Sequence, residues 1–169
     1  METLDIKWTH LTEVLNEFAD FFIQEARGNL DRNQSNASYS LYNSFEKIIE
    51  IGEDYYSVKI SLEDYWKYTE EGRGPGKFPP PDTIARWIDV KGITPYPDSN
   101  GRIPSVDQLT YLIGRKISID GTEPHPFFEP AREEAIEKFE LAIDQAISLD
   151  IEDFINESVD RMFDELKNF

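Results

Sequence analysis

The 169-residue sequence contains no cysteine, and it lacks both long apolar runs and a basic, then apolar, N-terminal stretch. The missing cysteine excludes a disulfide framework and a thiolate metal site, and it suits a reducing compartment. A membrane-spanning helix needs about 18 consecutive apolar residues, which occur nowhere in the sequence. We therefore expect no membrane association and no leader peptide, and a chain made in the cytosol.

Positive charge is also scarce, because the chain has 17 Lys and Arg but 34 Asp and Glu, which gives a net charge of −17. Such a field repels the phosphate backbone that supplies most nucleic-acid affinity, so general DNA or RNA binding is not expected. The acid is uneven. Residues 129–169 contain 13 acidic and 4 basic residues. Residues 70–88 contain three of each and therefore have no net charge.

Apolar residues are sufficient for a core, at 39% hydrophobic and 13% aromatic. A chain of this length can bury enough apolar surface to offset the entropy lost on folding. We expect a single folded domain over residues 1–169, without internal repeats or a domain linker.

The first part of the chain is predicted to form a helix, a loop and a hairpin. Apolar residues at three- and four-residue spacing predict a helix from about residue 8 to residue 27, ended by Gly28. The Asn- and Ser-rich segment 29–44 is predicted to be a flexible loop. Two β-prone runs, 45–51 and 55–62, flank a Gly-containing turn and predict an antiparallel hairpin.

A Gly- and Pro-rich segment follows, between short predicted helices. One or two helical turns are expected to end at Gly72, and residues 70–81 are expected to form a rigid Gly/Pro loop. Asp82 is the predicted cap of the next short helix, which Gly92 ends. Its predicted inward residues are Ile84, Trp87 and Ile88.

The last part of the chain is predicted to be mostly helical. Ser105 is a predicted cap for a helix that ends near Ile119. Pro130 suits the first turn of the next helix, and Asp150 suggests a fresh cap before helical periodicity resumes. The whole pattern predicts an α+β fold, with a small antiparallel β-sheet or hairpin packed against long N-terminal and C-terminal α-helices and short helices inserted between them.

The segment Gly-Arg-Gly-Pro-Gly-Lys-Phe invites comparison with a phosphate-binding loop. That pattern requires Gly where Glu71 stands and Ser or Thr where Phe78 stands, so a nucleotide site is not predicted. The two histidines, His10 and His125, are far apart in the sequence, and the acidic pairs at helical spacing are typical of a solvated face. We therefore expect no catalytic residues, no cofactor and no metal, and not an enzyme.

Three blocks of the sequence resemble a known family. They are SLYNSF (40–45), YWKYTEEGRGPGKFPPPDTIARWIDVKGI (65–93) and GTEPHPFFEPAREEA (121–135). Together, and in this order of elements, they resemble the small head-tail connector or tail-completion proteins of tailed bacteriophages, which are related to phage minor tail and virion-morphogenesis proteins.

The resemblance implies a structural protein that assembles into a ring between the portal-bearing head and the tail. The implied partners are a portal or adaptor protein and a tail terminator or tail-tube protein, with DNA passing through without specific binding. The implied location is the neck or tail of the virion, after synthesis in the bacterial cytoplasm. Seven residues in or near the Gly/Pro loop and the start of the last helix are the candidate partner interface: Arg73, Lys77, Phe78, Tyr65, Tyr68, Phe127 and Phe128.

Two other functions stay open. The charge fits a small acidic adaptor or a nucleic-acid mimic that inhibits a host DNA-binding enzyme. An enzyme acting on carbohydrate would instead need a pocket with two carboxyl groups about 5 to 10 Å apart.

Overall fold

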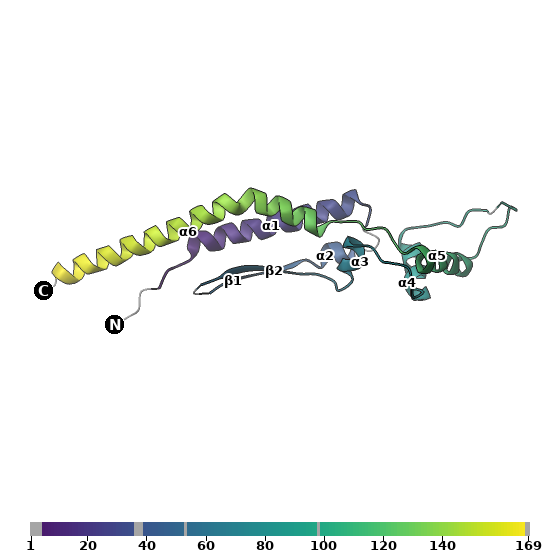
Figure 1. Ribbon diagram of the computed structural model, residues 1–169, viewed down its shortest axis with the longest axis horizontal. Coiled ribbons are helices and arrows are strands. Elements are labelled where there is room, and N and C mark those ends of the chain that lie inside the picture. Colours follow the sequence, from purple (N-terminus) through teal and green to yellow (C-terminus); the bar gives the residue numbers. More distant parts are fainter. Residues whose placement is uncertain (1–4, 36–38, 53, 98, 168–169) are drawn as a thin grey trace. The chain divides into compact units, whose positions relative to one another are not determined.

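The computed structural model describes residues 5–35, 39–52, 54–97 and 99–167 (Figure 1). The elements are, in chain order, α1 (Thr9–Arg32), α2 (Ser40–Asn43), β1 (Glu46–Ile51), β2 (Tyr56–Ser61), α3 (Trp66–Glu70), α4 (Pro81–Val90), α5 (Val106–Asp120) and α6 (Phe128–Lys167). In chain order, a two-stranded antiparallel sheet thus follows a long N-terminal helix and precedes a long C-terminal helix, with short helices inserted. The predicted α+β class is confirmed.

The chain divides into two compact units, which are described separately. Unit 1 takes in residues 1–25, 46–61 and 130–169, and unit 2 takes in residues 26–45 and 62–129.

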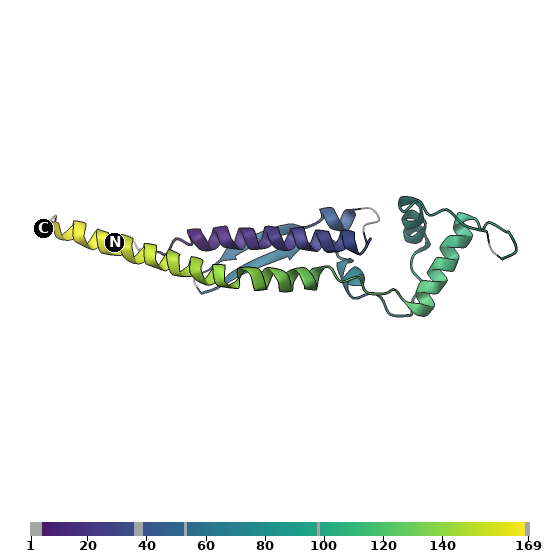
Figure 2. The same cartoon turned by 90° about the horizontal axis from the view of Figure 1, so that it is seen from above.

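Unit 1 is a pair of antiparallel helices with a hairpin beside them. The first part of α1 and α6 run side by side in opposite directions in both views (Figures 1 and 2). Leu11 donates to Asp150 at 2.9 Å, and the ring of Phe18 meets that of Phe139 at 5.9 Å. The buried residues recur at helical spacing and include several alanines, which allow close approach of the helices. They are Leu11, Leu15, Ala19, Phe22, Ile23, Ala131, Ala135, Phe139 and Ala146.

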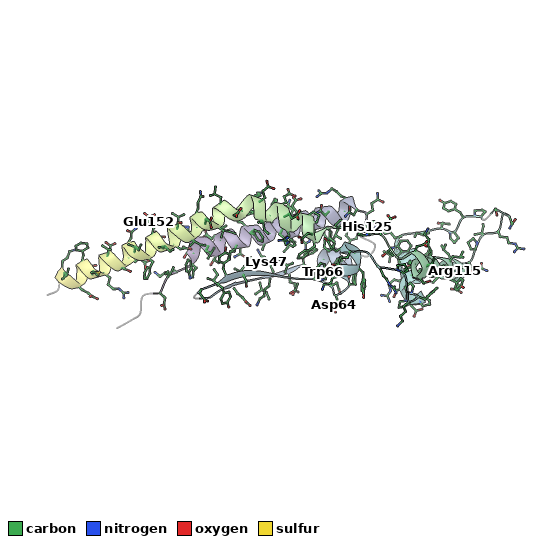
Figure 3. The ribbon with its side chains drawn as sticks, in the orientation of Figure 1. Lys47, Asp64, Trp66, Arg115, His125 and Glu152 are labelled. Carbon is green, nitrogen blue, oxygen red and sulfur yellow. The ribbon has the colours of Figure 1, made fainter. Side chains whose placement is uncertain are left out.

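The hairpin of unit 1 pairs β1 with β2 in an antiparallel register, in which Ile49 lies opposite Val58. An isolated two-stranded hairpin is at best marginally stable, so its contacts to the helices matter. Lys47 on β1, labelled in Figure 3, provides one of them. Its Nζ lies 2.7 Å from a carboxylate oxygen of Asp20 on α1. On the other face, Lys59 and Glu50 form a cross-strand ion pair at 2.5 Å.

Unit 2 is built from short helices and loops around aromatic side chains. Phe127 is fully buried, and its ring meets that of Phe45 edge to face at 6.3 Å. Trp66 on α3 packs against Phe128 at 4.9 Å. The guanidinium of Arg27 lies over the Tyr42 ring at 5.2 Å and donates to the Tyr42 carbonyl oxygen at 2.9 Å.

Helices α4 and α5 pack against each other within unit 2. Ile84 and Ile88 are buried on α4, and Gly114 is buried on α5. A Cβ at Gly114 would lie only 2.3 Å from the Phe78 ring, so glycine is what admits this aromatic ring. Ser105 caps α5 in a capping box with Gln108, and Gly92, at φ 61°, follows α4, as predicted.

Several local predictions were wrong. Helix α1 continues through Gly28 to Arg32, because the apolar repeat extends to the fully buried Leu30. Asp82 lies in the first turn of α4, and Pro80 occupies the cap position instead. Trp87 is 41% exposed, not core. Helix α6 is continuous through Asp150, so no fresh cap exists there.

The predicted flexible loop at 29–44 is partly helical. The last turn of α1 covers its beginning, and α2 covers Ser40–Asn43. Residues 36–38 of this prediction lie outside the described residues.

Candidate interface around the Gly/Pro loop

The Gly/Pro loop, residues 70–81, is tied by backbone hydrogen bonds to the segment that precedes α6. Arg73 and Thr122 exchange two such bonds, of 3.1 and 2.8 Å. Next to the loop, the backbone N–H of His125 donates to the carbonyl oxygen of Thr69 on α3 at 2.8 Å. Within the loop, the backbone N–H of Gly76 donates to the carbonyl oxygen of Ser118 on α5 at 2.9 Å. The second sequence block that carries the family resemblance and the first part of the third, residues 121–129, are therefore held against each other within unit 2.

Two glycines make this backbone approach possible. Gly72 and Gly121 have φ values of 72° and 79°, which favour glycine. A Cβ would lie 2.4 Å from the Thr122 oxygen at Gly72, and 2.0 Å from the Arg73 oxygen at Gly121. Close packing of two backbone segments accounts for the glycine at these two positions.

Glu70, at the end of α3, caps the start of α6. Its carboxylate accepts backbone N–H bonds from Phe127 at 2.7 Å, Phe128 at 2.8 Å and Glu129 at 3.0 Å. These amides have no intrahelical acceptor, and negative charge is favourable at a helix N-terminus. The sequence around Glu70 carries no local signal of this role, because the partners of Glu70 lie 57 to 59 residues away.

The candidate interface residues differ in their access to solvent. Tyr65, at the N-cap of α3, is 41% exposed, and Tyr68, on α3, is 64% exposed. Lys77 is exposed in the loop. The prediction that Phe127 lies at the interface is corrected, because its side chain is fully buried and forms part of the core of unit 2. Phe128 is half-buried against Trp66.

The remaining two candidates, Arg73 and Phe78, are half-buried and shape the loop. A guanidinium nitrogen of Arg73 donates to the carbonyl oxygen of Lys77 and so closes the loop. The Phe78 ring stacks on Tyr111 of α5 at 5.9 Å. Arg73 and Phe78 thus fix the part of the loop in which Lys77 is exposed.

Charge is divided very unequally between the units. Unit 1 contains 22 Asp and Glu against 7 Lys and Arg, a net charge of −15. Unit 2 contains 12 acidic and 10 basic residues, a net charge of −2. The Gly/Pro loop therefore belongs to a nearly neutral unit.

Two hollows lie on unit 1. One, of about 220 Å³, has Asp54 as the carboxylate among its described lining residues, which are mainly aromatic and aliphatic. The other lies along one face of α6, where Asp144 and Glu152 are two turns apart on the same helix. Among residues 5–35, 39–52, 54–97 and 99–167, no group of three His, Cys, Asp or Glu could hold a metal ion. No described helix is both long enough and apolar enough to cross a bilayer.

No family model, no curated protein and no solved structure matches the chain. The family resemblance therefore stays a prediction.

Proposed function

We propose that the chain is a structural virion protein of a tailed bacteriophage: a head-tail connector or tail-completion subunit that assembles into a ring joining the portal-bearing head to the tail. In this proposal the chain is made in the bacterial cytoplasm and ends in the neck or tail of the virion. It carries out no catalysis and needs no cofactor.

The observation that carries the proposal is the coupling of two of the three resembling blocks. Glu70 and Arg73 from one block hold Phe127 and Thr122 from the other. A surface fixed in this way loses little conformational entropy when a partner binds. A preformed loop therefore suits a subunit that docks onto its neighbours during assembly.

The division of charge supports a ring through which DNA passes. Acidic side chains repel the phosphate backbone, so a lumen lined by unit 1 would let DNA slide without binding it. The nearly neutral unit 2 would then meet the portal or adaptor and the tail terminator or tube protein. A ring with a basic lumen would contradict this arrangement.

The first test is the location of the chain. A phage that lacks the gene is complemented with the tagged chain, and purified virions are examined by electron microscopy with a gold-labelled antibody. Label at the neck or tail is expected. Virions that form normally and contain none of the chain would overturn the proposed function.

The second test concerns the loop. Lys77→Glu combined with Tyr68→Ala changes two exposed side chains of unit 2 and is expected to leave the fold intact, while heads and tails accumulate unjoined. Arg86→Glu, at an exposed residue of α4, is the matched charge control. If the double variant gives as many infectious particles as the wild type, the loop is not part of the interface.

The charge of unit 1 also favours a second candidate function, an acidic adaptor or nucleic-acid mimic that inhibits a host DNA-binding enzyme. Such a protein would be absent from virions, and DNA would compete with it for the enzyme. The labelling experiment therefore separates the two functions.

A further inference from the structure

Helix α6 extends well past its partner helix. Helix α1 begins at Thr9, whose backbone N–H donates to Asp150 at 3.1 Å. Beyond Asp150, α6 continues for 17 residues to Lys167, and none of these is buried. We name residues 151–167 the α6 extension; its yellow-green to yellow ribbon is visible in Figure 1.

The α6 extension has one apolar face. Its exposed apolar residues recur at helical spacing and are 39% to 69% exposed: Ile151, Ile155, Val159, Met162, Phe163 and Leu166. The opposite face carries Asp153, Glu157, Asp160 and Asp164. An isolated helix of this length is marginal in water, so packing of the apolar face against another surface would stabilise it.

The size of this face matches a specific interface. Six side chains at these exposures present on the order of 600 Å² of apolar surface, against about 800 Å² per partner in a standard interface. A single exposed patch of this size on a monomer commonly marks a binding site. The face is thus large enough for a stable contact with a second chain.

Charge decides which surface of a second copy can cover it. The α6 extension contains six acidic and two basic residues, a net charge of −4. Unit 1 of a second copy, at −15, would repel it, whereas unit 2 has a net charge of only −2. Charge therefore favours unit 2.

Within unit 2, α5 offers a matching face. Leu112 and Ile119 are 51% and 58% exposed. Arg115, seen on α5 in Figure 3, and Lys116 lie between them and are also exposed. These four positions share one side of the helix, because they fall at i, i+3, i+4 and i+7. The face combines apolar surface with two basic side chains, whereas the α6 extension has a net charge of −4.

We propose that the α6 extension of one copy docks onto α5 of a second copy. Its apolar face covers Leu112 and Ile119, and Glu165, which helical spacing places at the edge of that face, approaches Arg115 and Lys116. The contact is heterologous, so its repetition can close a ring. This inference deepens the proposed function, on which it rests for the assumption that copies assemble.

Two variants test the contact. The extension variant carries Val159→Glu and Met162→Glu, and the α5 variant carries Leu112→Glu and Lys116→Glu. All four residues are exposed, so both variants are expected to fold, which circular dichroism checks. The matched control carries Leu141→Glu and Leu149→Glu, at exposed apolar residues of α6 outside the extension.

Molar mass is measured by analytical ultracentrifugation at roughly 100 μM, above the micromolar Kd of a weak standard-size interface. The wild type and the control are expected to assemble, and each variant alone is expected to be monomeric. When the two variants are mixed, one intact extension meets one intact α5, so heterodimers form and assembly stops there. A symmetric contact between two extensions would instead leave the α5 variant assembled.

A monomeric wild type, an assembled α5 variant, or a mixture that stays monomeric would each overturn the proposed contact. Failure of the contact is distinguishable from failure of the proposed function. If the extension variant still joins heads to tails from within the neck, the contact is wrong and the function stands. If the mixed variants form heterodimers but virions lack the chain, the function is wrong and the contact stands.

Discussion

Unit 1 carries almost all of the net charge and unit 2 almost none, yet both use one acidic side chain in the same way. In unit 1, Asp150 accepts backbone N–H bonds from Thr9, His10 and Leu11 at the start of α1. In unit 2, Glu70 does the same for the start of α6. Each unit thus has one carboxylate that stabilises the start of a helix. This role does not depend on the many exposed acidic side chains of unit 1.

The units differ in what surrounds these caps. In unit 1, aliphatic residues, alanines and the rings of Phe22 and Phe139 pack between two long helices, and Asp150 is only 2% exposed. In unit 2, aromatic rings and hydrogen-bonded loops form the core, and Glu70 is half-buried. The same capping device therefore operates with little access to water in one unit and with more in the other.

The largest expected effect comes from the core of unit 2. Phe127→Ala removes a fully buried ring that meets Phe45, and it is expected to lower the free energy of unfolding by about 3–5 kcal/mol. Urea unfolding measures the loss, and Tyr68→Ala, at an exposed residue, is the control. Hydrogen exchange should show that α5 loses more protection than the hairpin of unit 1. Equal losses would mean that the two units unfold as one.

The cap of unit 1 is expected to have the next largest effect. Asp150→Ala leaves three amides at the start of α1 without their acceptor, which costs about 2 kcal/mol of stability. Urea unfolding again provides the measurement. Asp160→Ala, at an exposed residue of the same helix, is expected to stay within about 0.5 kcal/mol of the wild type. A loss at Asp150 no larger than at Asp160 would contradict its role as a cap.

The cap of unit 2 is expected to contribute less. Glu70→Ala removes the acceptor for the first amides of α6, but water can reach this half-buried site, so a loss of about 1 kcal/mol is expected. Glu71→Ala, at an exposed neighbour, is the control in the same unfolding measurement. A larger loss at Glu70 than at Asp150 would reverse the comparison between the units.

Salt is expected to have the smallest effect, and only on unit 1. Raising NaCl from about 0.01 to 0.15 M shortens the Debye length from about 30 to about 8 Å and screens repulsion within a unit of net charge −15. Hydrogen exchange of the hairpin amides should report stabilisation by less than about 1 kcal/mol, with no change in α4 and α5. Equal stabilisation of both units would show that net charge does not distinguish them.

Local signals in the sequence predicted much of the fold. Ser105 and Gln108 are three residues apart, and the hairpin strands are joined by a short turn, so neighbouring residues contain the required information. Gly72 was predicted to end α3, and its φ of 72° fits that role. Such features depend on backbone preferences that hold whatever the rest of the chain does.

Distant pairings could not be predicted in this way. Asp150 resembled a cap for its own helix but caps one that begins 141 residues earlier. Trp87 fits the inward pattern of α4, yet tertiary packing leaves it exposed. In the candidate interface, the family resemblance supplied the two blocks, but neither spacing nor composition showed that Glu70 joins them or that Phe127 is fully buried.

The capping of α1 by Asp150 has a consequence for the order of events on the ribosome. Helix α1 is made early, but the acceptor for its first amides emerges 141 residues later. Until then, its apolar face also lacks Ala135 and Phe139. Contacts of such long sequence separation form slowly and leave apolar surface exposed in the meantime. The first turn of α1 therefore stays without its acceptor until residue 150 has left the exit tunnel.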